Sequence, residues 1–270
     1  MSAGKKPAAG PRRTRRARSS GMQLIALRGL PEVTRGTDLA GQVMRAAARA
    51  GIRFQRGDIL VLAQKIVSKA EGRSIELSSI QPSALAREWA PRLRQDPRLT
   101  EVVLRESRRV LRMTERALIV ETRHGFVCAN AGVDRSNIPV QAGTRVTCLP
   151  DDPDASARRV AAALRRRAGV AVPVLISDTF GRPWRLGQVN VAIGAWGLRV
   201  LEDLRGSRDS HGHRLRATML AVGDELAAAA GLLMGKRESV PAVIVRGFRY
   251  HAAREPARCL LRPEAEDMFR

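Results

Sequence analysis

Apolar and polar residues alternate along this chain in blocks that predict strands and helices in turn. Short apolar runs, typical of buried strands, cover residues 59–63, 118–120, 146–149, 172–176 and 240–245. A helix is predicted after Thr37-Asp38, because Leu39, Val43 and Ala46 recur on one face before Gly51. A second, alanine-rich helix is predicted over residues 224–234. Strands that alternate with helices favour a mixed α/β fold.

The clearest helix start lies at residues 151–154 (DDPD). Acidic residues and a proline occupy its first turn, arginines 165–167 lie near its end, and Gly169 stops it. Residues 83–112 are predicted to be helical in pieces, with interruptions at Pro91 and at Asp96-Pro97.

The charge of the chain is strongly positive and partly local. The 270 residues contain 48 Lys and Arg against 26 Asp and Glu, a net charge of +22. Seven of these positive charges lie within residues 1–20, which contain no acid, so we expect a disordered basic tail there. The remaining excess of 15 favours polyanionic ligands. Residues 21–250 are then expected to be the folded domain, and residues 251–270 a peripheral C-terminal extension.

Several function classes are disfavoured by composition and motifs. Aromatic residues make up only 3% of the chain, which argues against a base-stacking nucleic-acid platform. No stretch approaches the roughly 20 apolar residues of a membrane-spanning helix. The three cysteines lie far apart, which favours a reducing cytoplasm over a disulfide framework or a zinc site. GxxxxGK[ST], GxGxxG and GxSxG are all absent.

Three segments are more polar and richer in glycine than packing requires. The first, QKIVSKAEG (64–72), directly follows a predicted strand, where Lys65, Ser68 and Lys69 are placed to hold phosphates; a solvated strand exit is the alternative. The second is ETRHGFVCANAGVDRSN (121–137). Its His124 is a candidate catalyst, although a single histidine is more often structural, and Cys128 is expected to be a small buried side chain.

The third segment, SDTFGRPWR (177–185), follows the strand predicted at 172–176. Mg²⁺ prefers hard oxygen ligands and usually takes one or two protein carboxylates. Asp134, Asp178 and Thr179 could supply that set, while Arg182 and Arg185 could bind phosphate oxygens. A capped turn is the structural alternative for Asp178-Thr179.

Together these segments resemble the coenzyme F-420-0:γ-glutamyl ligase family. Further matching stretches follow in family order, namely Gly29-Leu30-Pro31, DDPDASARR (151–159), DELAAAA (224–230), LLMGK (232–236) and VPAVIVRG (240–247). The resemblance implies a mixed α/β ligase with a two-part fold and an intertwined homodimer. It implies a reaction in which GTP phosphorylates the terminal carboxylate of a deazaflavin precursor and L-glutamate then forms an amide.

The resemblance also assigns roles to residues of this chain. It places the nucleotide on Leu30, Pro31, Glu32, Val33, Gln64, Lys65, Lys69, Asn137, Met234, Gly235 and Lys236. It places Mg²⁺ or Mn²⁺, as two ions, on Asp134, Asp178 and Thr179, with K⁺ as a further candidate ion. The candidate catalytic residues are Arg182, Arg185 and His124. One departure concerns Lys236, because some family members carry a glutamine there that helps to hold the second metal, and an ammonium group cannot do so.

Two other functions stay open at this level. One is a related nucleotide-dependent ligase or hydrolase with a different acceptor. The other, less favoured, is a nucleic-acid-binding protein that relies on the basic tail and surface. The number of glutamates added is also open.

Overall fold

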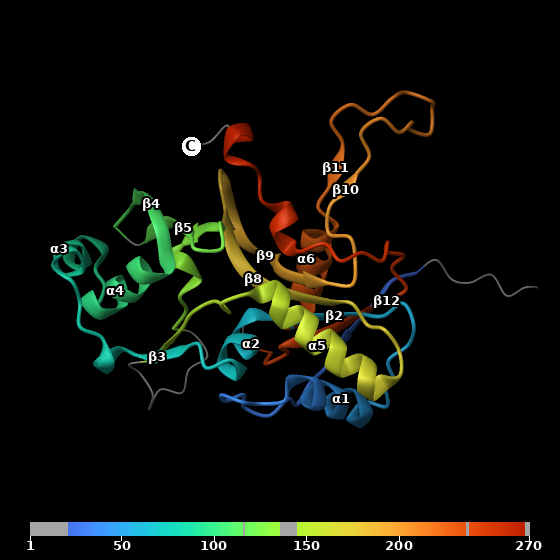
Figure 1. Ribbon diagram of the computed structural model, residues 1–270, viewed down its shortest axis with the longest axis horizontal. Helices are drawn as coiled ribbons and strands as arrows, with labels where there is room; N and C mark the ends of the chain where they lie inside the picture. Colours follow the sequence, from blue (N-terminus) through green and yellow to red (C-terminus); the bar gives the residue numbers. More distant parts are fainter. Residues whose placement is uncertain (1–20, 116, 136–144, 236–237, 268–270) are drawn as a thin grey trace, which may run out of the picture.

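The computed structural model describes residues 21–115, 117–135, 145–235 and 238–267 (Figure 1). The sequence predictions for residues 1–20, Asn137 and Lys236 therefore lie outside the described residues. The described part is a mixed α/β structure, as the alternating pattern predicts. No helix within it is long and apolar enough to cross a membrane.

A five-stranded sheet forms the centre of the molecule. Its strand order is β1-β12-β2-β8-β9, and only β2 and β8 run parallel. These strands are β1 (Gln23–Ala26), β2 (Ile59–Ala63), β8 (Val174–Arg182), β9 (Arg185–Trp196) and β12 (Ala242–Arg246). The middle strands β2 and β12 are almost entirely buried, which explains their continuous apolar sequences.

Helices cover both faces of this sheet. The helices α1 (Leu39–Arg49), α2 (Gln64–Ala70) and α5 (Pro153–Ala168) bury their apolar sides with Leu60, Leu62 and Ile176 on one face. The helix α6 (Val222–Met234) packs on the other face with Ile59, Val61 and neighbouring residues. Alternate residues of β2 thus belong to opposite cores, as the two-residue period of a strand requires.

A third core belongs to the middle of the chain. It lies among α3 (Ala84–Leu93), α4 (Pro97–Glu106) and a three-stranded antiparallel sheet of β4 (Ser107–Met113), β5 (Leu118–Thr122) and β6 (Val127–Ala129). The short strands β3 (Ser74–Glu76) and β7 (Arg145–Thr147) pair beside it. Figure 1 shows this green region to one side of the central sheet.

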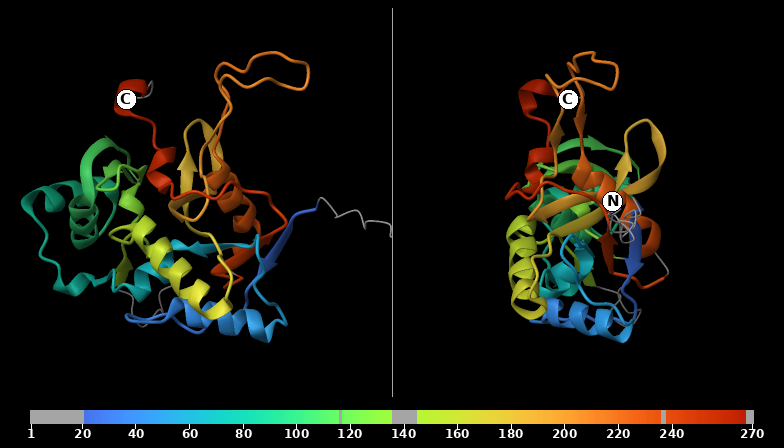
Figure 2. Two further views of the ribbon diagram at one scale, coloured as in Figure 1. Left: turned by 45° about the vertical axis from the view of Figure 1, so that its right-hand side comes forward. Right: turned by 90° about the vertical axis from the view of Figure 1, so that its right-hand side faces the viewer.

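Two hairpins extend from the central sheet. The first joins β8 to β9 and carries Trp184 and Leu186, which are 80% and 98% exposed. The second leads through β10 (Glu202–Asp203) and β11 (Met219–Leu220), and Figure 2 shows it projecting from the body.

Most predicted elements are present, and three differ in kind. Residues 64–70 form a helix, and residues 107–112, expected to be helical, belong to β4. Pro91 does not interrupt α3, which continues to Leu93 and ends at Arg94 in a left-handed conformation with a φ of 51°. The long strand β9 has no counterpart among the predicted elements.

The C-terminal segment is anchored more firmly than a peripheral extension. Ala257 is fully buried, and its backbone N–H donates to the Asp154 carboxylate at 2.7 Å. The same carboxylate accepts from the Ala195 N–H on β9 at 2.8 Å. Asp154 therefore joins the start of α5, the central sheet and the last part of the chain, and its burial raises the pKa of this carboxyl above its usual value.

Candidate active site

The ends of the two parallel strands, β2 and β8, bring the polar segments together. Ala63 at the end of β2 lies in register with Ser177 on β8. Directly after these positions the chain presents Gln64 and Lys65 on one side and Asp178 and Thr179 on the other. Carboxyl ends of neighbouring parallel strands are a common place for ligand binding in open sheets.

The helix α2 sets the direction of both lysines. It starts immediately after β2, and Lys65 and Lys69, four residues apart, share one of its faces. The opposite side buries Val67 in the core. The helix ends before Gly72, which has a φ of 76° and lies against the Arg35 side chain. Packing of α2 therefore turns both ammonium groups toward the same space.

That space is a cavity of about 380 Å³, which we call the first cavity. It collects residues from six separate parts of the chain, namely Leu30, Pro31, Glu32, Val33, Ala63, Gln64, Lys65, Ile66, Lys69, Asp134, Ser177, Asp178, Thr179, Asn190, Met234, Gly235, Ser239, Val240 and Pro241. Every described residue to which the sequence assigned the nucleotide or the metal lies in this lining. Their roles as ligands stay predictions.

Two ion pairs lie at the first cavity. The Lys65 Nζ is 2.7 Å from Asp134 Oδ2, and the Lys69 Nζ is 2.6 Å from Glu32 Oε1. The lysine side chains are mostly covered, at 16% and 13% exposure, whereas the Glu32 side chain is 66% exposed. The two ammonium groups are thus held at the cavity. Each can exchange its more exposed carboxylate partner for the oxygens of a phosphate.

The backbone around Asp134 is fixed on both sides. Asp134 and Thr147 exchange two backbone hydrogen bonds of 3.0 and 2.9 Å in an isolated bridge. Just before it, Asn130 and Ala131 have φ values of 51° and 54°, a conformation uncommon for residues with a Cβ. The Asn130 Oδ1 holds this turn by accepting from the Leu118 N–H at 3.0 Å.

Asn190 is a site residue that the sequence patterns did not single out. It lies opposite Thr179 in the β8–β9 pairing, and its Oδ1 is 3.2 Å from the Thr179 hydroxyl, which donates to it. Its Nδ2 donates to Ser177 Oγ at 3.3 Å and contacts Met234 Sδ at 3.7 Å. Asn190 therefore joins the polar end of β8 to the end of α6. The glycines within β9 mask its alternation, so no local signal in the sequence places Asn190 beside Thr179.

Asp134, Asp178 and Thr179 together form a donor set that fits a divalent cation. They offer two carboxylates and one hydroxyl, all hard oxygen donors, from two segments that are far apart in the sequence. No group of three His, Cys, Asp or Glu side chains within the described ranges could hold a metal. A set of two carboxylates agrees with Mg²⁺, which keeps few protein ligands and completes its shell with phosphates and water.

These same three residues also line a second cavity, of about 480 Å³. We call Asp134, Asp178 and Thr179 the shared wall. The other residues that line the second cavity are small, apolar or uncharged, namely Cys128, Ala129, Asn130, Gly132, Val133, Phe180, Gly181 and Gln188. The two cavities therefore meet at the candidate metal ligands.

Cys128 is a buried side chain of the second cavity, as expected. Burial, and then the nearby Asp178 charge, raise the pKa of its thiol to about 12. A thiol with such a pKa is protonated at neutral pH and is a poor nucleophile.

The three candidate catalytic residues lie elsewhere. Arg182 and Arg185 are backbone partners in the strand register at the tip of the β8–β9 hairpin. The Arg182 Nη2 donates to the Leu186 carbonyl at 2.6 Å. Neither arginine lines the first or the second cavity. His124 also lies outside both linings. The structure thus does not bring these three residues to the shared wall, and their catalytic roles stay predictions.

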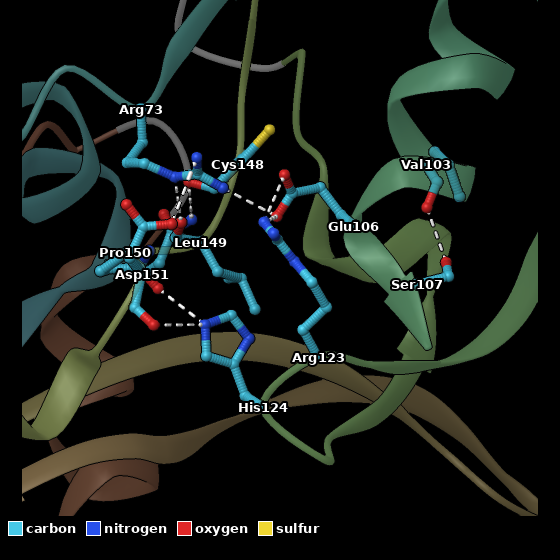
Figure 3. A network of polar contacts seen from close by, with 11 residues as sticks. Arg73, Val103, Glu106, Ser107, Arg123, His124, Cys148, Leu149, Pro150 and Asp151 are labelled. Atoms are coloured by element: carbon cyan, nitrogen blue, oxygen red, sulfur yellow. Dashed lines mark hydrogen bonds and ion pairs between the residues drawn. The ribbon is translucent and has the colours of Figure 1, made fainter. Parts of the chain in front are cut away.

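His124 instead belongs to a network of polar contacts (Figure 3). Its Nε2 is 2.8 Å from the Pro150 carbonyl and 3.1 Å from the Asp151 carbonyl, so this nitrogen carries the proton. Its ring stacks on Phe126. These contacts hold the turn after β5 against the chain that leads into α5.

The remainder of this network is built on one buried carboxylate. Glu106, whose side chain is 8% exposed, accepts from Arg73 at 2.8 Å and from Arg123 at 3.0 Å. Arg73 also donates to the Leu149 carbonyl at 3.0 Å. The network joins α4, the turn after β5 and the segment after β7, and we call it the Glu106 network.

Comparisons with known proteins agree with the geometry. Residues 29–247 match the family described as F420-0:Gamma-glutamyl ligase. The chain is 46% identical over 253 residues to the Coenzyme F420:L-glutamate ligase of Methanothermobacter thermautotrophicus, covering 93% of this chain and 99% of that protein. The proteins of the same name from Methanopyrus kandleri and Methanocaldococcus jannaschii are 46% and 41% identical, over 88% and 80% of this chain and 94% and 86% of their own lengths.

Proposed function

Because the chain belongs to the F420-0:γ-glutamyl ligase family, we propose that it joins L-glutamate to the deazaflavin precursor of coenzyme F420 through an amide bond. GTP drives the reaction, and GDP and phosphate are released. The observation that carries this proposal is the convergence of two lysines, two aspartates and a threonine on the first cavity, within a chain that shares nearly half of its residues with named ligases.

The nucleotide is assigned to the first cavity. Lys65 and Lys69 supply positive charge for the phosphates, and residues 30–33 and 239–241 supply an apolar and backbone-rich surface for the remainder. The net charge of +15 that remains without residues 1–20 favours the approach of two anionic substrates, GTP and the deazaflavin precursor.

The metal is assigned to the shared wall. Asp134, Asp178 and Thr179 would hold Mg²⁺ or Mn²⁺, which neutralises the developing charge on the phosphates when it is bound. Asn190 accepts the Thr179 hydroxyl hydrogen and so orients the hydroxyl oxygen that would face a cation. Lys65, held beside Asp134, would move its ammonium group to the phosphates.

The proposed chemistry has two steps. A carboxylate oxygen of the precursor attacks the γ-phosphorus, the bond to the β–γ bridging oxygen breaks, and GDP leaves with that electron pair. The neutral amine of glutamate then attacks the acyl carbon, phosphate leaves, and the nitrogen loses a proton. The residues of the cavity position the reactants and stabilise charge, which is the main need of phosphoryl transfer.

The test is a reaction followed by mass spectrometry. Purified protein is incubated with the precursor, L-glutamate, GTP and Mg²⁺ or Mn²⁺, and an added mass of one glutamate residue together with GDP is expected. GTP consumption without that mass gain would instead favour a ligase or hydrolase with another acceptor. If neither product forms with any metal, the proposed function is wrong. Sedimentation of the same preparation tests the expected homodimer.

A further inference from the structure

Asp134 of the shared wall is paired with a cation that the chain itself supplies. The Lys65 Nζ lies 2.7 Å from Asp134 Oδ2, a distance typical of a charge-assisted hydrogen bond. We infer that Lys65 holds the place of the divalent cation at Asp134 until the phosphates of the nucleotide draw its ammonium group away. Nucleotide binding thereby comes before metal binding or together with it. This inference rests on the proposed function and adds a role for Lys65 in coupling the two ligands.

The Lys65 ammonium group and a metal ion compete for the same carboxylate. Mg²⁺ binds its oxygen ligands at about 2.1 Å, so an ion on Asp134 Oδ2 would lie within about 5 Å of the ammonium nitrogen. Two cations at that separation repel each other, most strongly where water is partly excluded. The Lys65 side chain is only 16% exposed, so water screens its charge little. A shared wall without nucleotide is therefore expected to bind a divalent cation weakly.

The backbones of both partners are held in place, so the pair opens by rotation of side chains. Asp134 exchanges two backbone hydrogen bonds with Thr147. Lys65 lies in the first turn of α2, which is anchored by the buried side chains of Val67 and Ser68. Lys65 and Asp134 both line the first cavity, to which the nucleotide is assigned. The flexible lysine stem can therefore carry its ammonium group from the carboxylate to phosphate oxygens within the same cavity.

Lys69 provides a matched comparison on the same face of α2. Its Nζ lies 2.6 Å from Glu32 Oε1, and its side chain is covered to nearly the same degree as that of Lys65. Glu32 lines the first cavity but does not belong to the shared wall. Lys69 thus brings the same charge to the same cavity, while its partner Glu32 is not a candidate metal ligand. Loss of either lysine removes one positive charge, but loss of Lys65 also releases a carboxylate of the wall.

The measurement is equilibrium binding of Mn²⁺ to the protein without nucleotide, followed by the electron paramagnetic resonance signal of the free ion. Lys65→Met removes the charge but keeps an unbranched side chain, and it should bind Mn²⁺ about tenfold more tightly than the wild type. Lys69→Met should stay within about twofold of the wild type. Urea unfolding checks that each variant is folded. Lys65→Ala, which also removes the ammonium group, serves the same test if Lys65→Met does not fold.

Two further measurements locate the effect at Asp134 and at the nucleotide. Asp134→Asn, combined with Lys65→Met, should cancel the gain in Mn²⁺ affinity, because the carboxylate that the first substitution releases is then absent. Saturating GDP should raise the Mn²⁺ affinity of the wild type by a larger factor than that of Lys65→Met. The reason is that GDP phosphates also draw the ammonium group away from Asp134 in the wild type, whereas Lys65→Met has no ammonium group to remove.

Three results would overturn the inference. They are a Mn²⁺ affinity that Lys65→Met leaves unchanged, equal gains in Lys65→Met and Lys69→Met, and a gain that persists when Asp134→Asn is added. Failure of the proposed function looks different, because the variants would then change Mn²⁺ binding as expected, yet the wild-type protein would never add glutamate. Conversely, a wild-type protein that adds glutamate, with a Mn²⁺ affinity that does not respond to Lys65→Met, keeps the function and removes the inference.

Discussion

The shared wall and the Glu106 network are both groups of charged side chains between distant segments, but they differ in what surrounds them. In the network, Glu106 is almost fully covered, receives two arginines and lines neither the first nor the second cavity. At the wall, Asp134 is 37% exposed and faces two cavities. Charge clustering alone therefore does not mark a site in this fold. A clustered set beside open space can take a ligand, whereas a set that is enclosed and mutually paired stabilises the fold.

The largest effect is expected when a carboxylate of the shared wall is neutralised, and it is a loss of enzymatic turnover. Asp178→Asn keeps the shape of the side chain and the β8 backbone but removes the negative charge. We expect turnover to fall by about 100-fold or more, with little change in the urea midpoint, because charge is lost where the metal and phosphates are assigned. Steady-state kinetics and urea unfolding measure the two quantities.

A half-buried aspartate that lines neither cavity, Asp154, is the control for this variant. Asp154→Ala should lower the free energy of unfolding, because it removes the acceptor of two backbone N–H groups, and leave turnover per folded molecule within about threefold. Wild-type turnover in Asp178→Asn would remove this residue from the proposed chemistry.

The next effect is on the stability of the Glu106 network. Glu106→Gln leaves Arg73 and Arg123 without their carboxylate, so the free energy of unfolding should fall by about 2–3 kcal/mol, with turnover per folded molecule nearly unchanged. Glu88→Gln, in an exposed pair with Arg92, should cost less than about 0.5 kcal/mol. Loss of turnover in a folded Glu106→Gln protein would contradict the division between the two regions.

A third effect depends on pH and lies at the start of α3. The Glu101 carboxylate accepts from the Ser83 N–H at 2.9 Å and from Arg105 at 2.7 Å. The hydrogen bonds from Ser83, and then those from Arg105, lower the pKa of Glu101 to about 2. Because the folded pKa is lowered, the stabilisation is complete above the ordinary value near 4.5 and is lost as the pH falls toward 2.

Glu101→Gln should therefore be less stable than the wild type by on the order of 2 kcal/mol at neutral pH. The difference should shrink between about pH 4.5 and pH 2. Urea unfolding of both proteins at a series of pH values measures this difference in the free energy of unfolding. A difference that does not change with pH would show that the charge of Glu101 contributes little.

The smallest effect concerns His124. His124→Phe keeps a ring against Phe126 but removes the donor to the Pro150 and Asp151 carbonyls, so a loss of about 1 kcal/mol in unfolding free energy is expected. Turnover should stay within about threefold. A hundredfold loss of turnover in the folded variant would restore the catalytic interpretation of this histidine.

The sequence predicted the central strands and the capped helices because their signals are local. The apolar run 59–63 and the acid-proline start of α5 need no information from elsewhere. The seven residues of α2 are too few to show a helical period, and the glycines within β9 mask its alternation. The local propensity of residues 107–113 was overridden by pairing with β5.

The sequence indicated which polar residues belong to the site, but not how they are arranged in space. The motifs held the correct polar residues, yet only the resemblance to a family suggested that Asp134 and Asp178 meet, since the contact depends on the whole path between them. His124 shows the converse. It lies in the same polar segment as Asp134, and nothing in the local pattern separates a residue that faces a cavity from one that joins two loops.

The most direct measurement is a crystal structure of the protein with GDP and Mn²⁺ bound. It should place an anomalous manganese peak between the carboxylates of Asp134 and Asp178, with the phosphates near Lys65 and Lys69 and the nucleoside in the first cavity. A nucleotide bound elsewhere, or manganese on other ligands while the shared wall stays paired with lysine, would contradict the account.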